Sequence, residues 1–276
     1  MLEKTLQPQP IYPTASLTVS NETYTIEVGQ SVSPTFSVGL NQGNYKYEGG
    51  SNQGATVCAK TDQTVSGVRE ADLNKASGTV GTFTALDSDN STTKATVVAS
   101  VDYGQDTSSF QLTNSLGKAA TTSKIGAGTT ANVTKYVKIT GVRNWFYGVD
   151  TDGTETIDSA FIRGLTVGGN CETALNKTTG KRLTAGAGAK RIVIAIPKKN
   201  TSTSMQSVNQ AKTLTTVYLE SASDTPLWPD NADGYKKQAE PVSVNDASGA
   251  NPINYDVWIY QPASISPTEV HNIVIS

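Results

Sequence analysis

The amino-acid sequence predicts an all-β protein with two β-sandwich domains in tandem. Ser and Thr together make up roughly a quarter of the 276 residues, and Thr is β-branched and favours strands. Ser, Asn, Asp and Gly favour turns, so this composition indicates many short strands joined by polar loops. Segments in which polar and apolar residues alternate recur along the chain with turn residues between them, which is the pattern of a sandwich.

The first domain is predicted over residues 14–141 and is expected to be immunoglobulin-like. Tyr24, Ile26 and Val28 alternate with Thr25 and Glu27, as in a half-buried strand. The weak periodicity between residues 104 and 134 predicts a long loop or an irregular hairpin. Further strands are expected at 16–19, 36–40, 45–47, 82–84, 95–102 and 136–139.

Residues 1–13 precede this domain and are predicted to form an extended N-terminal attachment arm. Pro8, Pro10 and Pro13 punctuate the segment. Proline lacks a backbone N–H and moves the preceding residue out of the helical region, so the segment is expected to be extended. Such an arm is suited to docking onto a neighbouring subunit.

The second domain is predicted over residues 142–276. Trp145–Val149 is expected to be an aromatic strand, and Ala160–Leu165 a short helix that leads into a turn. Arg191–Pro197 is nearly continuous in apolar residues, which indicates a central strand buried on both faces. Further strands are expected at 214–219 and 255–260, and the terminal Ile273–Ile275 is expected to pair inside a sheet.

Charge and hydropathy argue against nucleic acids and membranes as partners. The net charge is −2 and the basic pairs are scattered among acidic residues, whereas nucleic-acid binding needs a basic face. No stretch approaches the length of a transmembrane helix, and the first residues lack the apolar core of a signal peptide. Cys58 and Cys171 are far apart in sequence, so the fold is not expected to depend on a disulfide framework.

The supply of catalytic residues is poor, so the sequence predicts a protein that is not an enzyme and has no cofactor. His271 is the only histidine, and a Ser-His-Asp or Cys-His site would have to use it. It is expected to be a surface residue before the terminal strand. A histidine-based metal site lacks ligands for the same reason.

Three loops resemble ligand sites superficially. Asp150–Gly153 and Asp87–Asn90 contain paired acidic residues, but the spacing of a calcium loop is missing. Both are expected to be hairpin turns in which Asp and Asn cap their own backbone, with structural calcium as the alternative. Gly186–Lys190 precedes a strand rather than a helix, so it is expected to be a hairpin connection and not a phosphate loop.

Aromatic residues supply the candidate contacts. Trp145, Phe146 and Tyr147 are possible subunit contacts within a strong strand, where burial in the core is the alternative. Trp228 is expected in a proline-flanked loop, with Tyr235 nearby in the sequence. These two residues are possible glycan contacts, and the alternative is that the loop folds over the end of the sandwich.

Several segments from about residue 24 onward are packing and turn motifs rather than active-site motifs. They are Val28–Phe36, Leu40–Tyr45, Thr140–Val149, Ala160–Thr166, Ala189–Pro197 and Tyr255–Ile265. Their order and spacing resemble a family of tailed-bacteriophage virion structural proteins. The upstream segments fit the immunoglobulin-like half of that family, and residues 50–80 match less clearly.

This resemblance implies a head fibre, capsid decoration or tail component that projects from the virion and has no chemistry of its own. It implies other virion proteins as partners, with host surface glycans as a further possibility, and a homotrimer as the assembly. A carbohydrate-binding module and a cell-surface adhesin are the alternatives, although the expected lack of a signal peptide argues against the adhesin. A glycan-degrading tail-spike enzyme is disfavoured because the sequence shows no internal repeat.

Overall fold

The computed structural model describes residues 7–41, 43–46, 77–107, 109, 111–171, 174–176, 178–198 and 212–276. Cys58 lies outside these described residues. The chain folds into two compact units that interleave along the sequence. The first unit contains residues 1–24, 32–83 and 93–138, and the second contains residues 25–31, 84–92 and 139–276. The second unit therefore includes two short segments from the N-terminal half of the chain.

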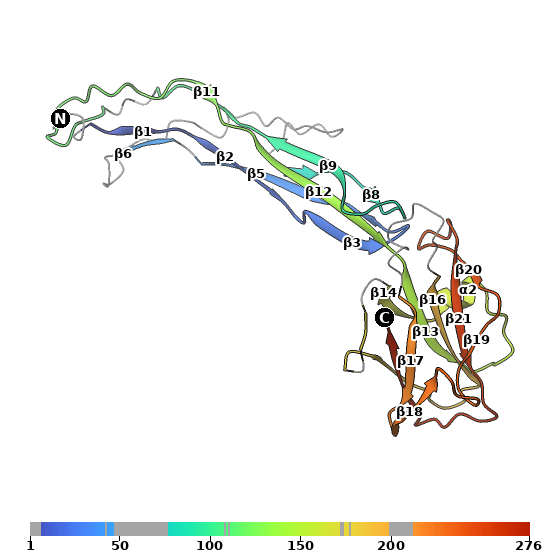
Figure 1. Ribbon diagram of the computed structural model, residues 1–276. Helices are drawn as coiled ribbons and strands as arrows, with labels where there is room; N and C mark the ends of the chain where they lie inside the picture. Colours follow the sequence, from blue (N-terminus) through green and yellow to red (C-terminus); the bar gives the residue numbers. More distant parts are fainter. Residues whose placement is uncertain are drawn as a thin grey trace. The chain divides into compact units, whose positions relative to one another are not determined.

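The prediction of an all-β fold is confirmed, because the described residues form many strands and one short helix (Figure 1). None of the helices in the described ranges is long and apolar enough to span a membrane. In the N-terminal half the strands are β1 (Gln9–Ile11), β2 (Thr14–Val19), β3 (Thr23–Glu27), β4 (Ser31–Val32), β5 (Thr35–Asn41), β6 (Asn44–Lys46), β7 (Ser77–Thr79), β8 (Phe83–Thr84), β9 (Thr92–Ala99), β10 (Asp102–Tyr103), β11 (Gly128–Thr129) and β12 (Val133–Val142).

The C-terminal half adds the helix and the remaining strands. The predicted helix at 160–165 is present one residue earlier. The elements are β13 (Asn144–Asp150), α2 (Ser159–Gly164), β14 (Thr166–Asn170), β15 (Lys181–Thr184), β16 (Arg191–Pro197), β17 (Leu214–Leu219), β18 (Ala222–Trp228), β19 (Lys236–Lys237), β20 (Val242–Val244), β21 (Ile253–Tyr260) and β22 (Val270–Ile275).

Two antiparallel sheets form the second unit. The larger sheet has the order β14-β13-β16-β21-β19, with β20 also paired to β21. The smaller sheet has the order β15-β22-β17-β18. Strand β22 pairs with β15 on one side and β17 on the other, so the C-terminal strand lies inside its sheet, as predicted.

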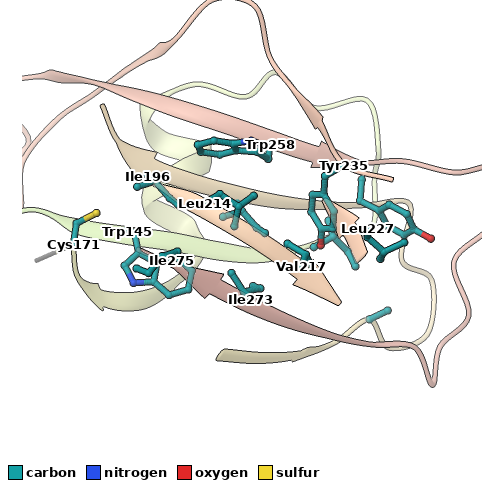
Figure 2. Close-up of a cluster of buried hydrophobic side chains, with 14 of the residues drawn as sticks. Trp145, Cys171, Ile196, Leu214, Val217, Leu227, Tyr235, Trp258, Ile273 and Ile275 are labelled. Carbon is teal, nitrogen blue, oxygen red and sulfur yellow. The ribbon is translucent and has the colours of Figure 1, made fainter. Parts of the chain in front are cut away.

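The core of the second unit lies between these two sheets (Figure 2). From the larger sheet, Trp145, Ile194 and Trp258 point into this core, and Val217 and Ile273 meet them from the smaller sheet. Residues two apart on a strand share one face, which explains why alternate members of β13 and β16 enter the cluster. This facing pair of sheets is a β-sandwich.

The opposite face of the larger sheet is covered as well. Val193 and Ala195 of β16 pack there with Val257 of β21 and with Ile162 of α2. Every residue of β16 is consequently buried. The sequence prediction that Arg191–Pro197 is buried on both faces is confirmed, and helix α2 is one of the elements that provide the second cover.

Two three-stranded sheets face each other in the first unit, although the C-terminal ends of β3 and β12 belong to the second. One has the order β2-β5-β7, and the other has the order β3-β12-β9. Leu17, Phe36, Val97 and Val137 meet between them in a separate buried cluster. The assignment of this domain as immunoglobulin-like stays a prediction.

In the part that the structure describes, the predicted N-terminal arm pairs with its own chain, and its role in attachment stays a prediction. Gln9–Ile11 forms β1 and pairs with β6. The hydroxyl of Thr122 donates a hydrogen bond of 2.7 Å to the carbonyl oxygen of Pro8. Pro8 and Pro13 are buried, and Pro10 is half-buried. These prolines therefore pack on the chain's own first unit. Proline is compatible with this arrangement because it is tolerated in the edge strands of a sheet.

Two connections also differ from the predictions. Residues 222–228 form strand β18 rather than a loop, and the strand accommodates Pro226 at a sheet edge, where an N–H is not needed for pairing. Gly186–Lys190 joins β15 to β16, which belong to different sheets. It is a crossing between the layers of the sandwich and not a hairpin connection.

Candidate functional site

The predicted subunit contacts lie on β13, and two of the three are core residues. Trp145 and Phe146 are each 1% exposed. They point to opposite faces of the sheet, Trp145 toward the smaller sheet and Phe146 toward α2. Tyr147 is half-buried and stacks on Trp145 with ring centroids 5.1 Å apart. The prediction is wrong for Trp145 and Phe146, because the chain's own second unit already covers both side chains.

A close backbone approach explains how Trp145 is covered. The backbone of β14 passes directly over the indole at Gly168, where an added Cβ would lie 2.1 Å from Trp145 Cε2. The register between β13 and β14 shifts at this point, which is a β-bulge. Glycine is required here because no side chain fits between the bulge and the ring.

The predicted glycan contacts do not form an exposed aromatic platform. Trp228 is half-buried at the end of β18, its ring edge meets Trp258 with centroids 6.1 Å apart, and its indole N–H donates to the carbonyl oxygen of Leu214. Tyr235 is 1% exposed. The prediction is wrong for Tyr235, because a buried ring offers no face to a sugar.

Tyr235 instead belongs to a buried polar network with His271 and Glu269. Its hydroxyl lies 3.0 Å from His271 Nδ1, and His271 Nε2 lies 2.8 Å from a carboxylate oxygen of Glu269. A carboxylate can only accept a hydrogen bond, so neutral His271 donates one from Nε2. Its Nδ1 accepts a hydrogen bond from the Tyr235 hydroxyl. Tyr260 stacks on Tyr235 and meets His271 edge-on.

The prediction that His271 is a surface residue is wrong, since its side chain is completely buried. Burial lowers the pKa of His271, and the nearby Glu269 carboxylate only partly opposes this effect. Burial likewise raises the pKa of the Tyr235 hydroxyl well above its usual value, and it raises that of Tyr260 to about 12. The three groups are therefore neutral at pH 7, and their hydrogen bonds hold β22 against the loop that carries Tyr235.

A second polar cluster surrounds Arg143 and Arg163. Arg143 forms a bidentate pair with Asp87, with bonds of 2.9 and 2.6 Å, and the Arg143 side chain is 2% exposed. Arg163 of α2 pairs with Glu27 at 2.9 Å, and Asn144 also donates to Glu27. Buried charges need such partners. The cluster ties the segments 25–31 and 84–92 to the rest of the second unit.

A buried aspartate extends this polar cluster. Burial acts to raise the pKa of Asp246, but hydrogen bonds from Ser248, Asn251 and backbone amides outweigh it and bring the pKa to about 2. Asp246 is therefore ionised and organises the turn that follows β20. Its bonds to its own loop account for both carboxylate oxygens, so its arrangement is that of a turn-forming residue.

The acidic loop at Asp150 is also a backbone-capping turn. Its carboxylate accepts from the N–H groups of Asp152 and Gly153 and pairs with Arg191 at 2.5 Å. The predicted self-capping is confirmed, although the loop connects a strand to helix α2 rather than forming a hairpin. Asp89 caps in the same way, accepting from the N–H of Leu86.

In the part of the chain that the structure describes, the potential metal ligands, including the cysteine thiol, do not form a metal centre. No group of three or more His, Cys, Asp or Glu residues is arranged to hold a metal ion among the described residues. Cys171 is buried, and its sulfur lies 3.6 Å from the carbonyl oxygen of Lys212. It packs in the sandwich core beside Trp145 (Figure 2).

Two depressions adjoin each other at one end of the second unit. They share the segment Gln261–Ala263, which follows β21, and their volumes are about 420 and 490 Å³. Asp152 and Lys190 line the first depression, and Asp233 and Lys236 line the second. Gln261 donates to the carbonyl oxygen of Gly153 across the first one. The first depression is mainly polar and the second mainly apolar, and each carries one acidic and one basic side chain.

Comparison with known proteins adds no relative. The chain matches no family model, and no curated protein matches it.

Proposed function

We propose that this protein is a structural component of a bacteriophage virion. It would project from the particle as a head fibre, capsid decoration or tail component, with no catalytic activity. Other virion proteins are its partners in this proposal, and the protein is located in the particle. The observation that carries the proposal is the position of the segments that resemble the virion family.

Those segments build the most protected part of the fold. Thr140–Val149, Ala189–Pro197 and Tyr255–Ile265 include β13, β16 and β21, the three central strands of the larger sheet. Their aromatic and aliphatic side chains pack on both faces of that sheet. What is shared with the virion family in this proposal is therefore a rigid scaffold rather than a reactive site, which suits a structural role.

The buried polar groups are consistent with the same role. The Tyr235–His271–Glu269 network resembles a catalytic triad in residue type, but His271 is fully buried and Tyr235 nearly so. A nucleophile must be reachable by its substrate. The network and the arginine clusters are connected to loops and sheets of their own unit, so they serve packing and orientation.

Purified phage particles provide the test of this proposal. Particles from cells infected with the phage that encodes this chain would be banded in a density gradient and digested for peptide mass spectrometry. The proposal predicts peptides of this chain in fixed ratio to the major capsid protein. Peptides found in the host envelope fraction and missing from the particles would contradict it and favour the adhesin.

Carbohydrate binding is the second candidate function, and the two adjoining depressions at Gln261–Ala263 favour it. Their mixed charged and amide groups can donate to and accept from sugar hydroxyls. A glycan array probed with the full chain would give hits that are lost in Gln261→Ala. An array without signal above background would remove this candidate while leaving the virion role in place.

The expected assembly is a homotrimer, as the resemblance to the virion family implies. Sedimentation of the full chain at micromolar concentration measures its mass directly. A mass of three chains, or a multiple of three, supports this proposal. A monomer across the accessible concentration range contradicts it.

A further inference from the structure

The outer strands of a sheet present unpaired N–H and C=O groups, and proteins protect such edges with charges, prolines, glycines, bulges or very short strands. Among the strands that the structure describes, β2 lies at the edge of the sheet β2-β5-β7 and pairs with β5 alone. All six of its residues are in register with β5, from Thr14 opposite Asn41 to Val19 opposite Phe36, without a shift. Its sequence, TASLTV, contains no charged residue, proline or glycine.

Every other outer strand among the described sheets carries at least one protective feature. Strands β14 and β18 are bulged against their neighbours. Strands β4, β8, β10, β11 and β19 have two residues each, β20 has only three, and β7 contains Gly78. The remaining outer strands contain a charge or a proline, which are Pro10 in β1, Glu27 in β3, Lys46 in β6, Lys94 in β9, and Lys181 and Arg182 in β15.

An apolar patch adjoins the unprotected strand. Ile11 and Tyr12 are separated from β2 by Pro13 alone, and they are 44% and 57% exposed. Large apolar side chains exposed next to each other mark interaction surfaces more often than isolated ones do. The edge of β2 therefore combines unprotected backbone groups with an exposed apolar surface.

We propose that β2 is a self-association edge that pairs antiparallel with β2 of a second copy of this chain. This inference rests on the proposal that several copies assemble, and it names a surface that joins copies in pairs, separate from the contacts that would form the trimer. A second copy brings identical charges to a two-fold contact, so an edge with lysines or glutamates would repel itself. Strand β2 has none, and it is thus suited to its own copy.

The side-chain pattern of β2 fits such a pair. With Ser16 on the two-fold axis, Thr14 of one copy faces Thr18 of the other on the exposed face. Ala15 faces Leu17 on the core face, so the buried layer continues across the contact. Cross-strand pairs of Thr with Thr or Ser, and of apolar residues with each other, stabilise antiparallel sheets.

A two-fold contact joins chains in pairs, so the proposed pairing predicts an assembly with an even number of chains. A trimer that used this edge would associate with a second trimer to give six chains. Sedimentation of the full-length protein distinguishes two or six chains from three.

The test uses opposite charges at the exposed centre of β2. Ser16→Lys and Ser16→Glu are each expected to halve the mass of the assembly, because like charges meet at the axis. Mixing the two variants is expected to restore the full mass, since Lys then faces Glu. Ser37→Lys is the matched control: Ser37 is exposed on the same face of the same sheet, but it lies on the central strand β5, and this variant is expected to keep the full mass.

The outcomes separate this inference from the proposed function. An assembled wild-type protein whose mass is unchanged by Ser16→Lys overturns the β2 contact and leaves the assembly and the virion role standing. Loss of mass in Ser37→Lys as well as in Ser16→Lys, without restoration on mixing, also overturns it. A monomeric wild-type protein overturns both the contact and the assembly, whereas the presence of the chain in particles is tested independently.

Discussion

Two sheets of the molecule differ in the number of faces that are buried. They are the larger sheet of the second unit and the sheet β2-β5-β7 of the first unit. The larger sheet is covered on one face by the smaller sheet and on the other by α2 and its neighbours. The sheet β2-β5-β7 buries one face and exposes the other, where Thr14, Ser16, Thr18 and Ser37 are all accessible. A continuous apolar strand and an alternating strand are the sequence signatures of these two arrangements.

The comparison teaches where each unit can make contacts. The second unit directs its large aromatic residues inward and protects the outer strands of its two sheets with bulges, charges or short length. The first unit has an outer face of small hydroxyl side chains and one unprotected edge. Interactions with further copies are therefore expected through the first unit, although the aromatic residues that attract attention in the sequence lie in the second.

The largest expected difference between the units concerns their ion pairs. Asp87→Ala leaves the nearly fully buried Arg143 without its bidentate partner, which is expected to destabilise the second unit by about 3–5 kcal/mol. Glu22→Ala removes the pair with Lys135 in the first unit, where both side chains are more than a third exposed, and is expected to cost about 0–1 kcal/mol. Calorimetric unfolding of both variants measures the difference. Equal losses would contradict it.

Adjacent residues on one strand sharpen the comparison further. In β16, Ile194→Ala and Val193→Ala face different layers, and both are expected to destabilise the protein, Ile194→Ala by about 2–5 kcal/mol. In β5, Phe36→Ala is expected to cost about 3–5 kcal/mol, whereas Ser37→Ala is expected to stay within about 0.5 kcal/mol.

Urea unfolding monitored by tryptophan fluorescence and circular dichroism would measure these four variants. The account requires two costly substitutions in β16 and one in β5. A neutral Val193→Ala would show that the cover on the α2 side is loose. A costly Ser37→Ala would show that the hydroxyl face of the first unit is packed.

The smallest expected effect is the pH dependence of the second unit. The pKa of His271 is lowered in the folded protein, so the unfolded chain takes up the proton first and stability falls as the pH drops below about 6.5. The slope reaches at most about 1.4 kcal/mol per pH unit. Because His271 is the only histidine, His271→Gln is expected to flatten the stability profile between pH 7 and 5.5. If the stability of His271→Gln fell with pH as steeply as that of the wild type, His271 would not be the group that causes the pH dependence.

Local sequence patterns were sufficient to predict the strands in which polar and apolar residues alternate and the strand that is continuously apolar. The predicted strands at 16–19, 36–40, 145–149, 191–197 and 255–260 all coincide with strands of the structure. In each of them, side-chain hydropathy follows the faces that are buried. The short helix was also predictable, since Asp158 caps it by accepting from the N–H of Phe161.

Other features depend on pairing between distant residues, which local patterns do not contain. Strand β14 contains Gly168 and Gly169, and glycine disfavours strands. The strand nevertheless pairs with β13, where its backbone covers Trp145 at a point that has no room for a side chain. Pro226 suggested a loop, but its strand lies at an edge. The burial of His271 depends on Tyr235 and Glu269, of which only Glu269 is near it in sequence. The sequence feature that could have predicted the burial of His271 is the apolar sequence of the terminal strand in which it lies.

The most direct test of the central claim is gold-labelled antibody against this chain, imaged by negative stain on lysates of phage-producing cells. The account predicts label on the particles, at heads or at tails, which would also locate the protein on the virion. Label confined to cell envelopes, with unlabelled particles in the same field, would contradict the virion role.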